Sequence, residues 1–297
     1  FGYTIQALLT SGENDSDGIS ISANSLALNS STIKDEAGNT ATITHNAVSN
    51  NSAYKVDTIP PTVNSAGITS ATGKQNNFVN PADVVSITAA FSETVLVVSG
   101  TPTLTIVVGS ANRTSTYNSG SNSANLVFRY TIQALLTSGE NDDDGISIGA
   151  NALSLNSGTV TDLAGNLASD ITHSAASDNS EYKVDTIQPA LNSFTMDDTD
   201  IKIGDTSVTT LVFSEEICPN ISGCAEKFIS NDITPQRGSL SSLSTSDNVT
   251  WTTTFTPTDL REVDINTLAL EKENYTDLAG NIGAADNETA NYLVDTL

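Results

Sequence analysis

The chain is poor in the residues that many binding and catalytic sites require. Of its 297 residues only 11 are Lys or Arg, two are His and two are Cys, and aromatic residues make up 5%. With 35 acidic residues the formal net charge is -24, which disfavours binding to nucleic acid or to anionic lipid. No run approaches the roughly 20 apolar residues of a membrane-spanning helix, so we expect no membrane insertion in this segment.

Motifs of catalysis are also missing. The sequence has no serine elbow, phosphate-binding loop, Cys–His pair or metal-hydrolase spacing. Carboxylates are abundant, but a glycosidase needs two of them in a cleft with aromatic side chains. His45 and His173 both follow Ile-Thr, and we predict that they are exposed strand residues. We therefore expect no enzyme.

The two cysteines, Cys218 and Cys224, are separated by five residues. In an oxidising compartment this spacing could close a small local disulfide loop. A zinc site would need closer spacing or more ligands. The alternative is a pair of free thiols.

What the chain does contain is a long internal repeat. Residues 3–21 recur as residues 130–148 with one change, Ser16 against Asp143, and the match resumes at 35–39 against 162–166 and at 54–58 against 182–186. Such a period indicates one folding unit copied in tandem. We expect residues 1–58 to be the C-terminal part of an incomplete unit, whose first strands lie outside this sequence or come from another chain. Residues 59–186 would be a complete unit and 187–297 a divergent one, with proline-containing links at 59–61 and 187–189.

Apolar residues in the complete unit alternate with polar ones, as at Leu104, Ile106 and Val108, which is the period of a half-buried strand. Seven strands are predicted, and turn residues separate them. We therefore predict an all-β fold of tandem immunoglobulin-like β-sandwich domains in an elongated array. The only tryptophan, Trp251, alternates with threonines and Phe255 and is expected in a core. The predicted strands are 62–69, 84–91, 103–108, 113–117, 125–132, 153–160 and one near 182–184.

Three short motifs recur in the two later units. They are Phe-Ser-Glu at 91–93 and 213–215, Asp-x-Ala-Gly-Asn at 162–166 and 277–281, and Val-Asp-Thr at 184–186 and 294–296. The set resembles the bacterial immunoglobulin-like repeats of giant surface and secreted adhesins. That resemblance implies a stalk module on a bacterial cell surface or in a biofilm matrix, often with calcium between neighbouring repeats.

The acidic residues are predicted to gather where units meet. Connections in a seven-strand sandwich turn back at alternate poles, so acidic loops and the Val-Asp-Thr aspartate of one unit should face the Phe-Ser-Glu turn and the Asp-x-Ala-Gly-Asn loop of the next. Carboxylates and amide oxygens are ligands that Ca²⁺ accepts. The alternatives are a solvated acidic surface and, for residues 140–145, an Asx-rich turn with no ion. The predicted ligands are Asp15, Asp17 and Asp57 with Glu93, Asp162 and Asn166 at the first junction, and Glu140, Asp142, Asp144 and Asp185 with Glu215, Asp277 and Asn281 at the second.

Two functional interpretations follow. In the first, the chain is a non-catalytic extracellular stalk, whose partners are the neighbouring repeats of the same chain. In the second, it is a subunit of an extracellular filament or sheath, in which identical chains complete one another by strand exchange.

Overall fold

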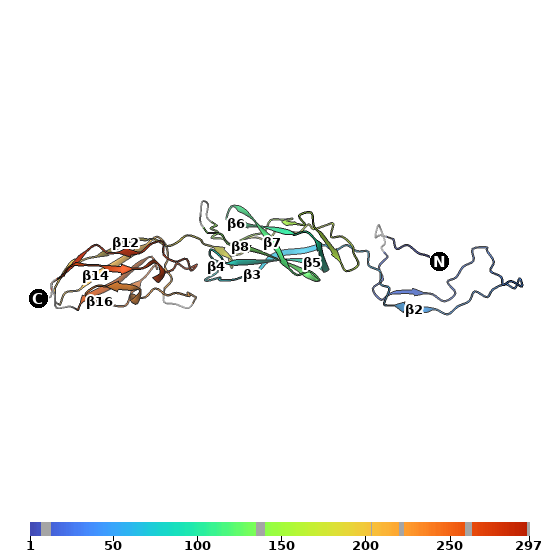
Figure 1. Ribbon diagram of the computed structural model, residues 1–297, viewed down its shortest axis with the longest axis horizontal. Coiled ribbons are helices and arrows are strands. Elements are labelled where there is room, and N and C mark those ends of the chain that lie inside the picture. Colours follow the sequence, from blue (N-terminus) through green and yellow to red (C-terminus); the bar gives the residue numbers. More distant parts are fainter. Residues whose placement is uncertain (7–12, 135–139, 203, 220–222, 259–262, 296–297) are drawn as a thin grey trace.

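The fold is all-β. A computed structural model describes residues 1–6, 13–134, 140–202, 204–219, 223–258 and 263–295. Within these ranges the helical segments are two short 3₁₀ turns, η1 (Ser230–Asp232) and η2 (Lys272–Asn274), and no helix is long and apolar enough to cross a membrane. Figure 1 shows two β-sandwiches in a row, with the residue 1–58 segment continuing beyond the middle one.

The middle unit is built on one curved sheet. Its long strand β5 pairs with β3 and β8 and, beyond a register irregularity, with β10. The strand order of the sheet is β10-β5-β8-β7-β6-β9, with β3 also paired to β5. A short parallel pair, β4 with β11, lies apart from this sheet. The strands are β3 (Val63–Ala71), β4 (Phe78–Val79), β5 (Val84–Ser99), β6 (Thr103–Val108), β7 (Ala111–Ser119), β8 (Ser123–Thr131), β9 (Leu153–Ser154), β10 (Thr159–Asp162) and β11 (Lys183–Val184).

The alternation of buried and less buried residues along the strands shows which side chains form the core of this unit. Along β6 the residues Leu104, Ile106 and Val108 are buried and their neighbours are half-buried, because successive side chains of a strand point to opposite faces. Leu126 and Phe128 of β8 are buried in the same cluster. The predicted strand at 103–108 is confirmed.

Two strand predictions are wrong in part. Phe91 and Glu93 do not lie in a turn after a strand, because β5 continues through them to Ser99 with a register irregularity between Ala90 and Val95. The predicted strand 153–160 is two short strands, β9 and β10. A turn with positive φ at Asn156 and Ser157 separates them.

The last unit has a separate core, rich in aromatic residues. Trp251 is buried as predicted, and its ring lies 5.1 Å from that of Phe228. Its strands form one five-stranded and two three-stranded sheets. They are β12 (Leu191–Met196), β13 (Asp200–Lys202), β14 (Ser207–Phe213), β15 (Ile233–Pro235), β16 (Gly238–Leu240), β17 (Ser244–Thr245), β18 (Thr250–Pro257), β19 (Val263–Asn266), β20 (Leu268–Leu270), β21 (Asn287–Glu288) and β22 (Tyr292–Asp295).

Residues 1–58 contain the strands β1 (Ile19–Ile21) and β2 (Val48–Asn51). This segment keeps the hydrogen bonds of its repeat partner: Asp15 bridges Val56 as Asp142 bridges Val184. Its apolar side chains are nevertheless exposed. Ile19 is 45% exposed, whereas the matching Ile146 is fully buried.

The two histidines are not exposed strand residues. His173 lies outside the strands and is buried; its Nε2 accepts hydrogen bonds from the backbone N–H of Ala152 at 2.9 Å and of Leu153 at 3.3 Å. Its Nδ1 lies 2.8 Å from the Ser174 carbonyl oxygen, which identifies Nδ1 as the protonated nitrogen. His45 also lies outside the strands, is half-buried, and its Nε2 accepts from the backbone N–H of Ser25 at 3.1 Å. The histidines join two loops in each repeat.

Candidate metal sites at the two junctions

The second junction begins where β11 ends. Asp185 follows this strand, and its backbone N–H donates to the Val79 carbonyl oxygen at 3.1 Å. Its Oδ1 accepts the N–H of Ile187 at 2.9 Å. The chain then enters the last unit through the segment that contains Pro189. The half-buried Asp185 is thus held at the point where one sandwich passes into the next.

The Asp-x-Ala-Gly-Asn motif of the last unit forms a tight turn around its own carboxylate. Oδ1 of Asp277 accepts the backbone N–H groups of Ala279 at 2.8 Å and Asn281 at 2.9 Å, and Oδ2 accepts the Asn281 amide at 2.8 Å. Gly280 completes the turn at φ 91°, which glycine adopts without steric cost. The Asn281 Nδ2 also donates to the Asp185 carbonyl oxygen at 3.0 Å and so joins the two units.

Three carboxylates meet at this point. Oxygens of Asp185, Glu215 and Asp277 lie within 4.8 Å of one another. Burial, with the neighbouring charges of Asp185 and Asp277, raises the pKa of Glu215 to about 7. Burial also raises the pKa of Asp277 to about 6, and the charge of Asp185 adds to this. Three ionised carboxylates this close together repel one another, so the group suits a cation.

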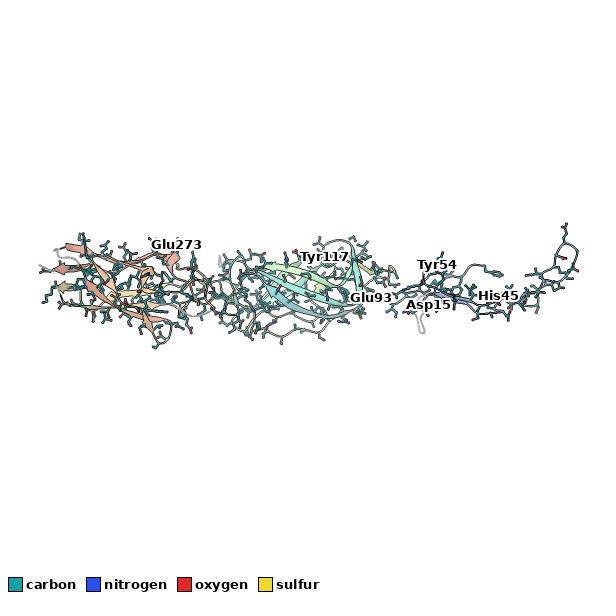
Figure 2. The ribbon with its side chains drawn as sticks, turned by 90° about the horizontal axis from the view of Figure 1, so that it is seen from below. Asp15, His45, Tyr54, Glu93, Tyr117 and Glu273 are labelled. Carbon is teal, nitrogen blue, oxygen red and sulfur yellow. A yellow bond between two sulfur atoms is a disulfide. The ribbon has the colours of Figure 1, made fainter. Side chains whose placement is uncertain are left out.

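The first junction repeats this arrangement. Oxygens of Asp57, Glu93 and Asp162 again lie within 4.8 Å of one another. Asn166 donates its amide to Asp162 Oδ2 at 2.7 Å and to the Asp57 carbonyl oxygen at 3.0 Å. Burial, followed by the charges of Asp57 and Asp162, raises the pKa of Glu93. Figure 2 shows Glu93 at the end of the middle unit that faces the residue 1–58 segment.

Each junction thus has three carboxylates and one asparagine in matching positions, although the second and third units differ in most of their sequence. A carboxylate-only donor set suits a hard divalent cation such as Ca²⁺ or Mg²⁺. Of the predicted ligands, the structure brings together the following: Asp57, Glu93 and Asp162 with Asn166 at the first junction, and Asp185, Glu215 and Asp277 with Asn281 at the second.

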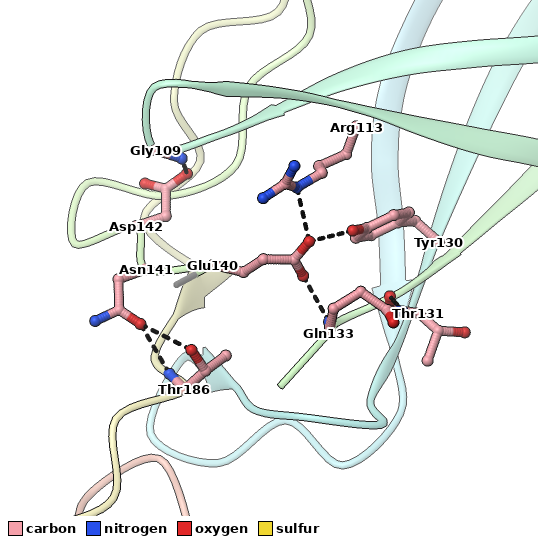
Figure 3. A network of polar contacts seen from close by, with 9 residues as sticks. All are labelled: Gly109, Arg113, Tyr130, Thr131, Gln133, Glu140, Asn141, Asp142 and Thr186. Atoms are coloured by element: carbon pink, nitrogen blue, oxygen red, sulfur yellow. Dashed lines mark hydrogen bonds and ion pairs between the residues drawn. The ribbon is translucent and has the colours of Figure 1, made fainter. Parts of the chain in front are cut away.

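The remaining predicted ligands lie outside these two groups. Glu140 is buried and receives three protein contacts, shown in Figure 3: Arg113 Nε lies 2.7 Å from its Oε1, the Tyr130 hydroxyl donates to the same oxygen, and the Gln133 N–H donates to Oε2 at 2.6 Å. Burial, and then the hydrogen bond to Glu140, raises the pKa of Tyr130. Glu140 therefore acts inside the middle sandwich.

Asp142 has a similar structural role. Its Oδ1 accepts the Gly145 N–H and its Oδ2 the Gly109 N–H, both at 2.7 Å. Asp15 accepts the Gly18 N–H at 2.8 Å in the same way. This is the Asx-rich turn left open as the alternative to an ion-binding loop. Asp144 is exposed, and Asp17 accepts a hydrogen bond from Asn50.

Two residues of the loop at 140–145 contribute to the second junction in ways that the sequence analysis did not predict. Asn141 Oδ1 accepts the Thr186 N–H at 2.9 Å and its hydroxyl at 3.2 Å, which anchors the residue next to Asp185 (Figure 3). Asn14 holds Thr58 in the same way, at 2.8 and 3.2 Å. Asp143 is the loop residue whose charge, after burial, raises the pKa of Asp185. The identity of residues 13–15 and 140–142 was the sequence signal for the asparagines.

Cys218 and Cys224 form a disulfide with a Cα–Cα distance of 5.9 Å. The bond lies near the second junction, because the Asn76 Nδ2 of the middle unit is 3.9 Å from each sulfur. The loop between these cysteines includes residues 220–222, which lie outside the described ranges.

Residues 185–294 match the sequence profile of the family described as Bacterial Ig-like domain. This part of the chain is thus similar to bacterial Ig-like domains. The match begins at Asp185 and includes both motifs that form the second carboxylate group. Because the resemblance noted from the three motifs pointed to this family, that prediction is confirmed for these residues.

A comparison with solved structures found similarity to FdeC, an adhesin of Escherichia coli. The alignment has 11% identity and a TM-score of 0.33, and covers 86% of this chain and 70% of that one. A comparison with curated protein sequences found no match.

Proposed function

We propose that this chain is a non-catalytic spacer in a bacterial extracellular adhesin or surface fibre, and that Ca²⁺ at the two junctions holds its Ig-like units in line. The observation that carries the proposal is the repeated carboxylate group. Asp57, Glu93 and Asp162 at one junction match Asp185, Glu215 and Asp277 at the other. In both groups the first residue belongs to one unit and the other two to the next.

A cation in such a group would favour alignment of the units. Three carboxylates from two units repel one another when ionised, and a divalent ion between them reverses the sign of that interaction. Because Ca²⁺ takes six to eight oxygen ligands in flexible geometry, backbone carbonyls and water can complete its shell. A ligand at a hundred times its dissociation constant stabilises the state that binds it by about 2.7 kcal/mol. Millimolar extracellular calcium would reach this ratio at a site with a dissociation constant of about 10 μM.

The test compares the protein in calcium and in chelator. We expect calcium to raise the melting temperature and to narrow the distribution of solution dimensions from small-angle X-ray scattering. Asp185→Asn should remove the part of this response that comes from the second junction. Asp178→Asn, which changes an exposed aspartate outside both groups, is the matched control. Equal responses of the Asp185 variant and the wild type would contradict the proposal.

A filament subunit is the second candidate, and the exposed apolar face of residues 1–58 favours it. Phe1 and Ile19 are exposed, whereas their repeat partners Phe128 and Ile146 are buried under strands of the middle unit. Strands of another chain could cover this face in the same way. Concentration-dependent assembly in analytical ultracentrifugation would support the filament, and a monomer at all concentrations would exclude it.

A further inference from the structure

A second set of contacts crosses the second junction apart from the carboxylates. The Asn76 amide of the middle unit donates to the Leu278 carbonyl oxygen at 2.9 Å, and the Gln75 amide donates to the same oxygen at 3.2 Å. The Asn80 amide donates to the Ala279 carbonyl oxygen at 3.1 Å. Three side-chain amides of one unit thus bind two consecutive carbonyls of the next.

The donors are held rigidly. Gln75 and Phe78 exchange backbone hydrogen bonds of 2.8 and 2.7 Å across the pair Asn76 and Asn77, which have φ of 49° and 68°. Positive φ at both central residues is the signature of a type I′ turn, which asparagine tolerates well. Phe78 then opens β4, which pairs with β11 directly before Asp185. The turn is therefore fixed to the strand that ends at the junction.

The last unit adds a contact of its own. The backbone N–H of Ala225, the residue after Cys224, donates to the Gln75 Oε1 at 2.8 Å. The Gln75 side chain therefore both donates and accepts across the junction. Since Ala225 adjoins the disulfide, the bond to Cys218 restricts the position of this donor.

The acceptor turn occurs a second time, on the middle unit, at residues 162–166. The Asp162 N–H donates to the Asn166 carbonyl oxygen at 3.0 Å, against 3.1 Å for Asp277 and Asn281 in the last unit. Gly165 has a φ of 96°, close to that of Gly280. The exposure of the two turns differs: Leu163 is 66% exposed, whereas the matching Leu278, whose carbonyl oxygen accepts the Gln75 and Asn76 amides, is half-buried.

We infer that the turn at residues 75–78, together with Asn80, is a docking element for the Asp-x-Ala-Gly-Asn turn of a following Ig-like unit, and that residues 162–166 are the matching acceptor for a preceding unit of the middle type. The occupant is thus a second copy of the middle unit, stacked head to tail. Residues 55–57 already lie beside this acceptor turn. Asn166 donates its amide to the Asp57 carbonyl oxygen, just as Asn281 donates to the Asp185 carbonyl oxygen at the second junction. A turn of the 75–78 kind beside Lys55 and Val56 would therefore meet residues 163 and 164.

This inference extends the proposed spacer role but does not depend on calcium. Amide-to-carbonyl hydrogen bonds carry no net charge, so they should orient the units with or without a cation. Calcium would instead act on the carboxylate groups. The two effects can therefore be separated in one set of samples.

The existing junction is tested with Gln75→Ala combined with Asn80→Ala, in chelator and in calcium. Asn76 is left unchanged because alanine at its positive φ would strain the turn. In chelator, residual dipolar couplings should give one common alignment tensor for the two sandwiches in the wild type and two different tensors in the double variant. In calcium, the two tensors of the double variant should move closer together, because its carboxylate group is intact. Asn118→Ala, on β7, is the control and should match the wild type. Retention of a common tensor by the double variant in chelator would overturn the docking role.

Calcium is followed in the same samples. If calcium leaves the alignment tensors of the wild type and of the double variant unchanged, but the double variant still loses its common tensor, the calcium proposal fails and the docking element stands.

The empty acceptor is tested in a chain that carries an additional copy of residues 59–127 before Phe1. Solvent paramagnetic relaxation of the Leu163 methyl groups should fall severalfold when the added unit docks. Gln75→Ala and Asn80→Ala in the added copy alone should restore it. Equal relaxation in the original and extended chains would refute docking at this surface.

Discussion

In the absence of divalent cations, the last Ig-like unit should become more stable towards unfolding as the pH falls from 8 to 5. In the cation-free protein, burial and the charges of Asp185 and Asp277 raise the pKa of Glu215 from 4.5 to about 7. Burial raises the pKa of Asp277 from 3.8 to about 6, with a further contribution from Asp185. Both groups therefore bind protons more tightly in the folded state than in the unfolded state.

The sign follows from this difference. Above pH 7 both carboxylates are ionised in the folded and the unfolded protein, and the folded state carries the full electrostatic cost. As the pH falls towards 5 the folded state takes up protons first, so the free energy of unfolding rises. Each pKa difference corresponds to about 3 kcal/mol at full strength. Glu215 is only partly buried and the two groups titrate together, so we expect a total near 2 kcal/mol.

Urea unfolding followed by tryptophan fluorescence measures this quantity, because Trp251 is the only tryptophan and lies in the core of the last unit. Glu215→Gln should raise stability at pH 8 and remove much of the pH dependence. Saturating calcium should stabilise the wild type most at pH 8, where protons do not compete for the carboxylates. Stability in chelator that stays flat, or falls, between pH 8 and pH 5 would refute the reasoning.

Three further predictions concern stability. His173→Ala leaves the backbone N–H groups of Ala152 and Leu153 without their acceptor, so calorimetry should show the middle unit less stable by about 2–4 kcal/mol. Gly145→Ala should destabilise the same unit strongly in thermal melts, because Gly145 has φ of 103° and an added Cβ would lie 2.1 Å from the Asn179 carbonyl oxygen; Gly149→Ala, where a Cβ meets no atom within 4 Å, is its control. Reduction of the disulfide between Cys218 and Cys224 should cost the last unit about 2 kcal/mol, as expected for a short loop; an unchanged urea midpoint after reduction would contradict this.

The fold could be predicted from the sequence because strand alternation is a local property. The pattern at Leu104, Ile106 and Val108 located β6 without further information. Strand ends were less predictable, because they depend on pairing between distant residues. Phe91 continues into the later part of β5, which pairs with β10 from Val95 to Ser99, whereas the matching Phe213 ends β14.

The junction groups were predictable in outline from topology. Strand order placed Asp185 at the pole of the middle unit that faces the turn containing Asp277 in the next unit, and the structure brings them together. The acidic loop lies outside these groups, and sequence does not show which of its carboxylates already have protein donors. Glu140 is paired with Arg113 from a different strand, and Asp142 with Gly109. The docking turn at residues 75–78 was also missed, since its partners are backbone carbonyls of another unit.

The most direct test of the account is calorimetric titration of Ca²⁺ into the cation-free chain at pH 7.5. We predict two binding sites per chain, with one lost in Glu93→Gln, the other lost in Glu215→Gln, and both retained in Asp178→Asn. Absence of binding at millimolar calcium, or an unchanged number of sites in both glutamine variants, would contradict the claim that calcium joins the Ig-like units at these two junctions.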